Sequence, residues 1–462
     1  MITAIKPTIS ACMIVKNEQD LLPNCLLSIK NAVDEIIIVD TGSTDNTVSI
    51  AKNFGAKVYF YQWNDNFSEA RNYSLKYATS DWILYIDADE ELEQADIPLL
   101  RDAINQSVYN GIIVGIYSKM KDTHHKFYRT RVFRRGKAYY KDIIHEQIIL
   151  EGERLSTGIR IHHYGYDLDE KKMQMKGQRT TQLLKKQIEM DTLNSFAWFN
   201  YVRNYRSQEM YEEGVRAGED AIKVITPEMN LGHYIMIVYE TANCYLHREN
   251  YRKAKELCNS ALSKLADLKI TPDNIDIIFT LACIYLKEGS YSEAIDYFKR
   301  YLSLLEWYVE NMNKNFLMTD TLGYESVAYN GIGCSFGKLG QWQTAITHLQ
   351  KAISLNPKYL GAYKNLALCY STIGNDIESI NILLKTISEG IADKEVLLKL
   401  GDLYIQKGMF ENAILYIEMY LKKCPEDKKA LLKIARCYEK MGNLEAALVG
   451  YKFALEGGNK TE

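Results

Sequence analysis

The sequence predicts two domains of different class: an α/β domain at residues 1–166 and an all-α superhelix of helical repeats at residues 196–460. In the first domain, short apolar runs typical of buried strands alternate with segments of helical periodicity. In the second domain, small and aromatic residues recur every 34 residues. A chain of 462 residues is also too long for one ordinary hydrophobic core.

The elements of the first domain follow from its apolar pattern. Buried strands are predicted at residues 9–15, 35–40, 57–61 and 82–86, and helices at residues 19–30, 47–54 and 68–78. Two later runs, at 111–118 and 127–133, predict the arms of a hairpin around a polar turn at 119–126. Ligands of such folds bind at loops that follow the carboxyl ends of parallel strands, so we expect the functional site there.

Four series of positions spaced by 34 residues define the second domain. They are Gly333, Ala367, Gly401 and Ala435; Phe336, Tyr370, Tyr404 and Tyr438; Gly340, Gly374, Gly408 and Gly442; and Ala345, Ser379, Ala413 and Ala447. This period, with small residues where two helices cross, is that of tetratricopeptide (TPR) repeats. Looser copies begin near Val202, Ala242 and Ala282, and the longer step from Ala282 to Gly333 predicts an insertion around residues 306–321.

We therefore expect four regular repeats and about three degenerate ones. The polar segment before them lacks a repeat signature, and residues 167–195 are predicted to form a connecting helix.

Composition narrows the possible partners and the compartment. A net charge of −3 gives no reason to expect a nucleic-acid partner or a polybasic membrane anchor. No apolar run approaches the ~20 residues of a transmembrane helix. The nine cysteines form no CxxC pair and read as buried free thiols, and no signal peptide precedes the first predicted strand. These features favour a cytoplasmic location.

Four segments of the first domain carry polar residues in a recognisable order. They are MIVKNE at residues 13–18, VDTGSTD at 39–45, NFSEARN at 66–72 and DAD at 87–89. Together they resemble the donor-site motifs of family 2 glycosyltransferases. The resemblance implies a GT-A fold, which is a Rossmann-like nucleotide-diphospho-sugar transferase domain. It also implies a UDP-sugar as donor and a divalent cation, Mn²⁺ or Mg²⁺, as cofactor.

The Asp-Ala-Asp segment fits the chemistry of a sugar nucleotide. The departing diphosphate must be stabilised, and a hard divalent cation held by oxygen ligands does this as a Lewis acid. The resemblance implies that Asp89 is a direct metal ligand and that Asp87 contacts the ribose or the metal shell, with Ala88 between them in the donor site. The alternative is a solvated acidic turn, since Glu90 and Glu91 follow.

The first two motifs supply the remaining expected contacts to the nucleoside. Asp40 ends a predicted strand, and the resemblance implies that it reads uracil; a strand-end turn cap is its alternative. The family usually has two consecutive acids here, and Thr41 replaces the second. Val15 and Asn17 are assigned to the donor site with Glu18. Glu18 is expected to face the ribose, or else to be a surface residue at a helix start.

Arg71 lies in the Ala-Arg-Asn sequence that family members place near the diphosphate. Its alternative is a surface salt bridge. Arg129 and Arg131 share one face of a predicted strand, and Arg131 could meet a phosphate or an acceptor carboxylate. A solvated edge strand protected by charge is the ordinary explanation of these arginines.

An inverting transfer needs a base that takes the proton of the acceptor. The resemblance points to Glu146 of a His-Glu pair, with Asp142 in reserve; a strand-edge carboxylate is the alternative. His162 and His163 end a β-like run, so their rings should point to opposite faces. His163 matches the position that completes the metal shell in several GT-A enzymes, and a histidine without a metal role is its alternative.

The combination of a short GT-A domain, a His-Glu pair and TPR-like repeats resembles bacterial peptide glycosyltransferases of the sublancin type. The resemblance implies an inverting enzyme that transfers sugar from a UDP-sugar to Cys or Ser of a peptide or protein. Transfer to a glycan or lipid-linked acceptor and a non-catalytic TPR scaffold remain alternatives. The repeats would offer a groove for a partner polypeptide or a surface for a homodimer.

Overall fold

The computed structural model describes residues 6–120, 123–164, 170–271, 273–311 and 319–456. Several predicted features lie outside these ranges: the centre of the predicted hairpin turn, Gly165 and Tyr166 at the end of the first domain, residues 167–169, and residues 312–318 of the predicted insertion. The chain forms two compact units, Met1–Met210 and Tyr211–Glu462, and each is described by itself. The predicted boundary between residues 195 and 196 stays a prediction.

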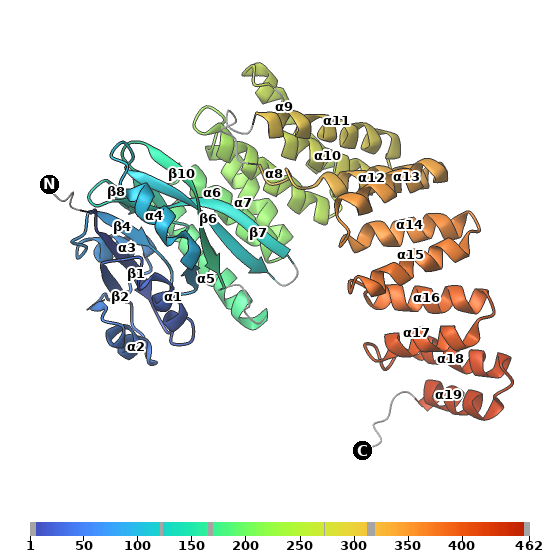
Figure 1. Ribbon diagram of the computed structural model, residues 1–462. Helices are drawn as coiled ribbons and strands as arrows, with labels where there is room; N and C mark the ends of the chain where they lie inside the picture. Colours follow the sequence, from blue (N-terminus) through green and yellow to red (C-terminus); the bar gives the residue numbers. More distant parts are fainter. Residues whose placement is uncertain (1–5, 121–122, 165–169, 272, 312–318, 457–462) are drawn as a thin grey trace. The chain divides into compact units, whose positions relative to one another are not determined.

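A twisted eight-stranded sheet forms the centre of the first unit, in the order β3-β2-β1-β4-β7-β6-β10-β5 (Figure 1). The strands are β1 (Ile9–Val15), β2 (Glu35–Asp40), β3 (Lys57–Phe60), β4 (Trp82–Tyr85), β5 (Glu90–Leu92), β6 (Gly111–Met120), β7 (Thr123–Arg134) and β10 (Arg154–His163). Strands β1 to β4 pair in parallel, whereas β7 is antiparallel to both β4 and β6. A separate hairpin joins β8 (Ala138–Lys141) to β9 (Gln147–Leu150).

The predicted strands of this sheet are confirmed, and β1 and β2 have the predicted bounds. The helices α1 (Leu22–Ile29), α2 (Thr47–Asn53) and α3 (Phe67–Leu75) lie within about one turn of their predicted ranges. The sequence pattern missed β5, the β8-β9 hairpin and α4 (Ile97–Ile104). Each of these is a short element, for which periodicity gives little signal.

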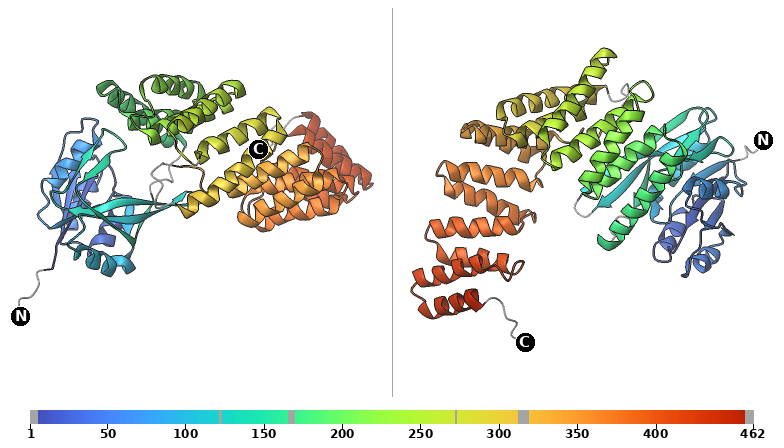
Figure 2. Two further views of the ribbon diagram at one scale, coloured as in Figure 1. Left: turned by 90° about the horizontal axis from the view of Figure 1, so that it is seen from above. Right: turned by 180° about the vertical axis from the view of Figure 1, so that it is seen from behind.

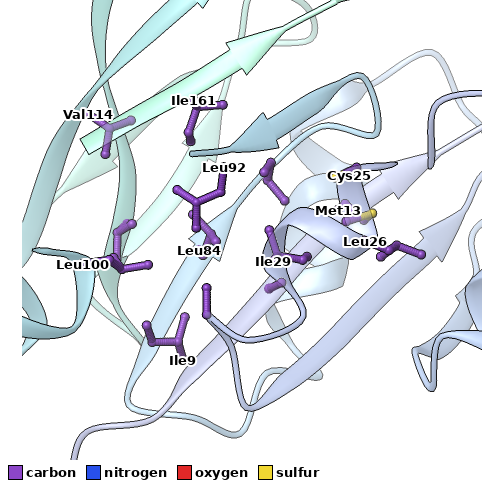
Figure 3. Packing of buried hydrophobic residues seen from close by; sticks show 14 of the residues in the cluster. Ile9, Met13, Cys25, Leu26, Ile29, Leu84, Leu92, Leu100, Val114 and Ile161 are labelled. Carbon is purple, nitrogen blue, oxygen red and sulfur yellow. The ribbon is translucent and has the colours of Figure 1, made fainter. Parts of the chain in front are cut away.

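Alternation along the strands creates a core on each face of the sheet. On one face, α1 and α4 cover residues such as Met13, Leu84 and Ile161, and Figure 3 shows Leu26 and Leu100 at this interface. The opposite face packs against α3 and the β8-β9 hairpin. The sheet is thereby fixed between two layers, and the loops at the carboxyl ends of β1, β2 and β4 stay available for a site.

Two helices that follow the sheet belong to the same compact unit. They are α5 (Glu170–Met190) and α6 (Ser195–Ser207), which pack against each other. Leu183 and Leu184 of α5 form a small buried cluster with Ile143 and Ile144. The predicted connecting helix therefore contacts the loop between β8 and β9.

The second unit consists of antiparallel helix pairs (Figure 2). Its helices are α7 (Tyr211–Val224), α8 (Leu231–His247), α9 (Tyr251–Asp267), α10 (Ile275–Glu288), α11 (Tyr291–Glu310), α12 (Glu325–Lys338), α13 (Trp342–Leu355), α14 (Leu360–Thr372), α15 (Asp376–Ser388), α16 (Lys394–Gln406), α17 (Phe410–Leu421), α18 (Lys428–Lys440) and α19 (Leu444–Glu456).

The small residues of the 34-residue period lie where paired helices touch. A Cβ added to Gly401 would come within 2.4 Å of Ile417, and one added to Gly333 within 2.6 Å of Leu349. The predicted reason for the period, close helix crossing, is therefore confirmed. The predicted fold class, an α/β domain followed by TPR-like helices, is confirmed as well. No described helix is both long and apolar enough to cross a bilayer.

Candidate active site

The predicted site residues come from the carboxyl ends of β1, β2 and β4, and from α3, β10 and the loop between β8 and β9. Residues from three of these sources meet around Asp87, which follows β4. The Arg71 guanidinium of α3 donates to Asp87 Oδ1 over 3.2 Å and also to Glu146, while the Tyr85 hydroxyl donates to Asp87. The candidate base and the Asp-Ala-Asp loop are thus joined through one arginine.

The arginine of this group is buried. Only 7% of Arg71 is exposed, and its guanidinium lies 4.1 Å over the Tyr85 ring. Burial acts to lower the pKa of Arg71, but the negative charges of Glu146 and Asp87 raise it, so the guanidinium stays charged. Arg71 therefore forms salt bridges in the interior, and the alternative of a surface salt bridge is wrong.

The loop after β4 is also buried in part. Glu90 is 1% exposed, accepts from the Asp87 backbone N–H over 3.0 Å, and pairs with Arg131 Nη2 at 2.5 Å. Arg131 comes from β7, which lies between β4 and β6. The interpretation of this strand as a solvated edge strand is wrong, and so is that of a solvated acidic turn at Glu90. Ala88, between the two aspartates in the sequence, is 5% exposed and belongs to the hydrophobic core of the domain.

The second aspartate of the loop faces the end of β10. His163 Nε2 lies 3.3 Å from Asp89 Oδ2, and His163 Nδ1 lies 3.3 Å from the Ser118 hydroxyl. Burial acts to lower the pKa of His163, but the hydrogen bond and charge of Asp89 raise it above its ordinary value. His162 instead lies 3.2 Å from Glu93. The predicted divergence of the two rings is confirmed, and His163 is the one that reaches the acidic loop.

Glu18 lies close to the same acidic loop. Its backbone N–H donates to the Thr47 hydroxyl over 2.8 Å, which fixes the turn after β1. Burial raises the pKa of Glu18 to about 7, and the charges of Asp89 and Asp87 add to the rise. Three carboxylates thus share a region of negative potential, which a cation would relieve.

Asn17 and Asp40 are held in turn contacts at the ends of β1 and β2. Asn17 has a left-handed backbone, and its side chain accepts from the Thr44 N–H over 2.7 Å. Asp40 is 2% exposed and accepts from the Gly42 and Ser43 N–H groups, each over 3.0 Å. The turn-cap alternative for Asp40 is therefore realised, and its contact with uracil stays a prediction. Val15, 3% exposed, ends β1 beside Asp40.

Asp142 and Glu146 have different surroundings. Asp142 Oδ1 accepts from Gln187 over 2.9 Å and from Asn194 over 3.1 Å, so its carboxylate is occupied by amides of the following helices. Glu146 contacts the Arg71 guanidinium instead. Of the two candidate bases, Glu146 is the one that joins the group around Asp87.

The residues at the acidic loop fit a divalent cation. Among the described ranges, no three His, Cys, Asp or Glu side chains are grouped to hold a metal ion. Mg²⁺ and Mn²⁺ that act on nucleotides need only one or two protein ligands, because phosphates and water supply the others. Asp89 and His163 are close enough to share one ion. The carboxylate of Asp87 already contacts Arg71, Arg131 and Tyr85, so its role as a metal ligand stays a prediction.

Sequence reasoning missed several residues of this group. Tyr85 and Tyr140 pack as aromatic neighbours around Arg71, and Glu90 anchors Arg131. Within the described residues, the Tyr140 hydroxyl and Arg131 Nε are buried polar atoms with no hydrogen-bond partner. For Arg131, the alternation of arginines with apolar residues along β7 was the only feature of the sequence that indicated a place in the site. The tyrosines read as ordinary core residues.

Comparison with known proteins agrees with the geometry. Residues 10–166 match the model of glycosyl transferase family 2. Tetratricopeptide repeat models match residues 275–304, 326–359, 395–427 and 429–452. These ranges coincide with the sheet domain and with helix pairs of the second unit.

The curated relatives include glycosyltransferases and a protein named for its TPR repeats. A TPR repeat-containing protein of Synechococcus elongatus is 36% identical over 187 residues, which cover 37% of this chain and 44% of the relative. The glycosyltransferase SunS of Bacillus phage SPbeta is 28% identical over 254 residues, 53% of this chain and 60% of its own. An uncharacterised glycosyltransferase of Rickettsia felis is 42% identical over 104 residues, 22% of this chain and 36% of the relative.

The alignments thus span about half the length of the first two relatives. With the sheet, the motif order and the family match in agreement, residues 10–166 of this chain form a glycosyl transferase family 2 domain, and tetratricopeptide repeats follow it.

Proposed function

We propose that this protein is a metal-dependent, inverting glycosyltransferase that transfers a sugar from a UDP-sugar to a Cys or Ser side chain of a peptide or protein. The observation that carries the proposal is the chain of contacts from Glu146 through Arg71 to Asp87, beside the Asp89–His163 pair. These contacts bring together a candidate base, the buried Arg71 guanidinium and a candidate metal site, at the loops where an α/β sheet binds its ligands.

Each group has a separate part in the proposed reaction. The acceptor sulfur or oxygen attacks the anomeric carbon of the sugar, its proton goes to the Glu146 carboxylate, and the bond from that carbon to the diphosphate breaks. UDP leaves with the electron pair, and the configuration at the anomeric carbon inverts. Arg71 offers positive charge to the diphosphate, which competes with Glu146 and Asp87 for the guanidinium.

The cation, when bound, neutralises the charge that develops on the departing diphosphate. Asp89 and His163 would hold it. A nitrogen ligand favours Mn²⁺ over Mg²⁺, because Mg²⁺ prefers oxygen ligands in a strict octahedron.

The repeats favour a polypeptide acceptor. Stacked TPR helices form an extended surface suited to a peptide segment or a partner protein, and they also offer a surface for a homodimer. The nine cysteines are free thiols, which supports a reducing compartment, and we place the protein in the cytoplasm. Similarity to a glycosyltransferase and to a TPR repeat-containing protein supports the proposal.

Release of UDP tests the proposal. The purified protein is incubated with UDP-glucose or UDP-N-acetylglucosamine, with Mn²⁺ or with EDTA, and with or without a peptide that contains Cys and Ser. We expect UDP release that requires Mn²⁺ and a peptide that gains the mass of one sugar. UDP release without peptide modification would favour a glycan or lipid-linked acceptor. No metal-dependent UDP release from any UDP-sugar would favour a non-catalytic scaffold.

A further inference from the structure

The loop that carries the candidate base has an uncommon backbone conformation at two residues. Asp142 and His145 both have left-handed backbones, with φ of 79° and 53°. Residues other than glycine adopt this region rarely, and they keep it where their surroundings hold them there. Glu146 follows directly, so whatever holds residues 142–145 also sets the position of its carboxylate.

The first support of this loop comes from the start of α3. The Phe67 N–H donates to the Ile143 carbonyl over 2.9 Å, and the Ser68 hydroxyl donates to the Asp142 carbonyl over 2.5 Å. Both donors lie within the NFSEARN motif, which also contains Arg71. One short helix therefore fixes the loop backbone and supplies the guanidinium that contacts Glu146.

The second support comes from α5. Gln187 is 4% exposed, and its Oε1 accepts from the Ile143 N–H over 3.0 Å. Its Nε2 donates to Asp142 Oδ1 over 2.9 Å. Asn194, which caps α6 by accepting from the Ala197 N–H, donates to the same Asp142 oxygen. The amide of Gln187 thus accepts from a buried backbone N–H and also donates to the Asp142 carboxylate, so one side chain holds two consecutive residues of the loop.

We infer that Gln187 is a positioning residue of the transferase: through Asp142 and the Ile143 amide it fixes the loop that presents Glu146. This inference rests on the proposed function, because it assigns Glu146 the part of base. It extends the catalytic unit beyond the family 2 domain, which ends at residue 166, to a helix that sequence reasoning treated as a connector. It also makes Asp142 a residue that supports the loop, and no longer the second candidate for the base.

Amide hydrogen exchange tests the holding of the loop without any need for activity. Gln187→Met keeps the length of the side chain and removes its hydrogen bonds to Asp142 and to the Ile143 and Ile144 N–H groups. We expect faster exchange at these two amides. Leu100→Ala, in the core on the α4 side of the sheet, is the control for general destabilisation. Unchanged exchange in Gln187→Met, or equal acceleration at these amides in Leu100→Ala, would overturn the inference.

Kinetics test whether the loop acts through Glu146. With UDP-glucose and Mn²⁺, Gln187→Met should lower kcat by about tenfold with little change of KM for the donor. In a Glu146→Gln background the same change should have no further effect, because the group that it positions is already lost. Effects that multiply in the double variant would mean that Gln187 acts independently of Glu146.

An exchange of partners provides a rescue. Gln187→Glu alone places two carboxylates together and should lose kcat. Adding Asp142→Asn restores the hydrogen bond in the reverse direction, because the amide at position 142 donates to the carboxylate at position 187. The double variant should recover most of kcat, and no recovery would contradict the proposed contact. If the wild-type protein releases no UDP from any UDP-sugar, the proposed function fails. The measurement of amide hydrogen exchange still decides whether Gln187 holds the loop.

Discussion

His163 Nε2 lies 3.3 Å from Asp89 Oδ2, at the point where β10 ends beside the loop after β4. The adjacent His162 turns to Glu93 instead, as alternation along a strand requires. The two neighbouring histidines therefore differ in one respect that matters for a metal, namely contact with the Asp-Ala-Asp loop. This difference provides a matched pair of variants.

We predict that His163→Ala raises the Mn²⁺ concentration for half-maximal UDP release by about tenfold or more, because the ion loses one of two protein ligands. His162→Ala should keep the wild-type Mn²⁺ dependence. A titration of UDP release against Mn²⁺ measures both variants. Equal dependence in the two variants would remove His163 from the metal site.

Arg71→Lys should weaken catalysis although the charge is kept. An ammonium cannot bond Glu146 and Asp87 in the planar arrangement of the guanidinium, nor stack on Tyr85. We expect kcat/KM for the UDP-sugar to fall by about tenfold to a hundredfold. Arg101→Lys, at a half-exposed salt bridge with Asp34, is the control and should change little. A wild-type rate in Arg71→Lys would argue that the guanidinium has no part in donor binding.

Glu146→Gln separates the chemical step from donor binding. The amide cannot accept the proton of the acceptor, so kcat should fall by about a hundredfold or more, while the Kd for UDP measured by calorimetry should change little. Asp142→Asn keeps an oxygen for Gln187 and Asn194 and should be milder. A larger loss of kcat in Asp142→Asn than in Glu146→Gln would exchange the two assignments.

A pH dependence of stability is expected from Glu35 at the start of β2. Burial acts to raise its pKa, but hydrogen bonds from Ser10, Lys57 and Thr79 lower it from 4.5 to about 2. A carboxylate whose pKa is lowered on folding stabilises the protein above its unfolded value, and this contribution is lost as the pH falls through the folded value.

Glu35→Gln should therefore lower the free energy of unfolding by about 2 kcal/mol at pH 7, and the difference from wild type should shrink between pH 4.5 and about 2. Urea unfolding at several pH values measures it, with the exposed Glu153→Gln as control. A difference that stays constant down to the lowest pH would mean that the charge of Glu35 does not contribute.

The parts of the fold that could be predicted are those with a strong local signal. Strands β1 and β2 are continuous apolar runs buried on both faces, and the 34-residue period marks helix crossings that only small residues permit. The opposite directions of His162 and His163 also follow from local geometry. By contrast, strand order has no local signal, so the place of Arg131 in an interior strand could not be read from its neighbours.

The acidic loop of the candidate site could be predicted from the sequence, but the residues that hold its carboxylates in place could not. Asp142 looked like a reserve base because its partners Gln187 and Asn194 lie far along the chain, in a segment without a motif. Glu90 looked like part of a solvated turn, since nothing in the sequence pairs it with Arg131. Long-range partners decide whether a carboxylate is free for chemistry, and a single sequence does not specify them.

Loss of metal-dependent UDP release in Asp89→Ala is the most direct measurement of the central claim. The wild-type protein should release UDP from a UDP-sugar with Mn²⁺ and stop when EDTA is added. Asp89→Ala should release none above background, while its circular dichroism keeps the helical signal of the repeats. An Asp89→Ala protein that releases UDP at the wild-type rate, or a wild-type protein that ignores EDTA, would contradict the account.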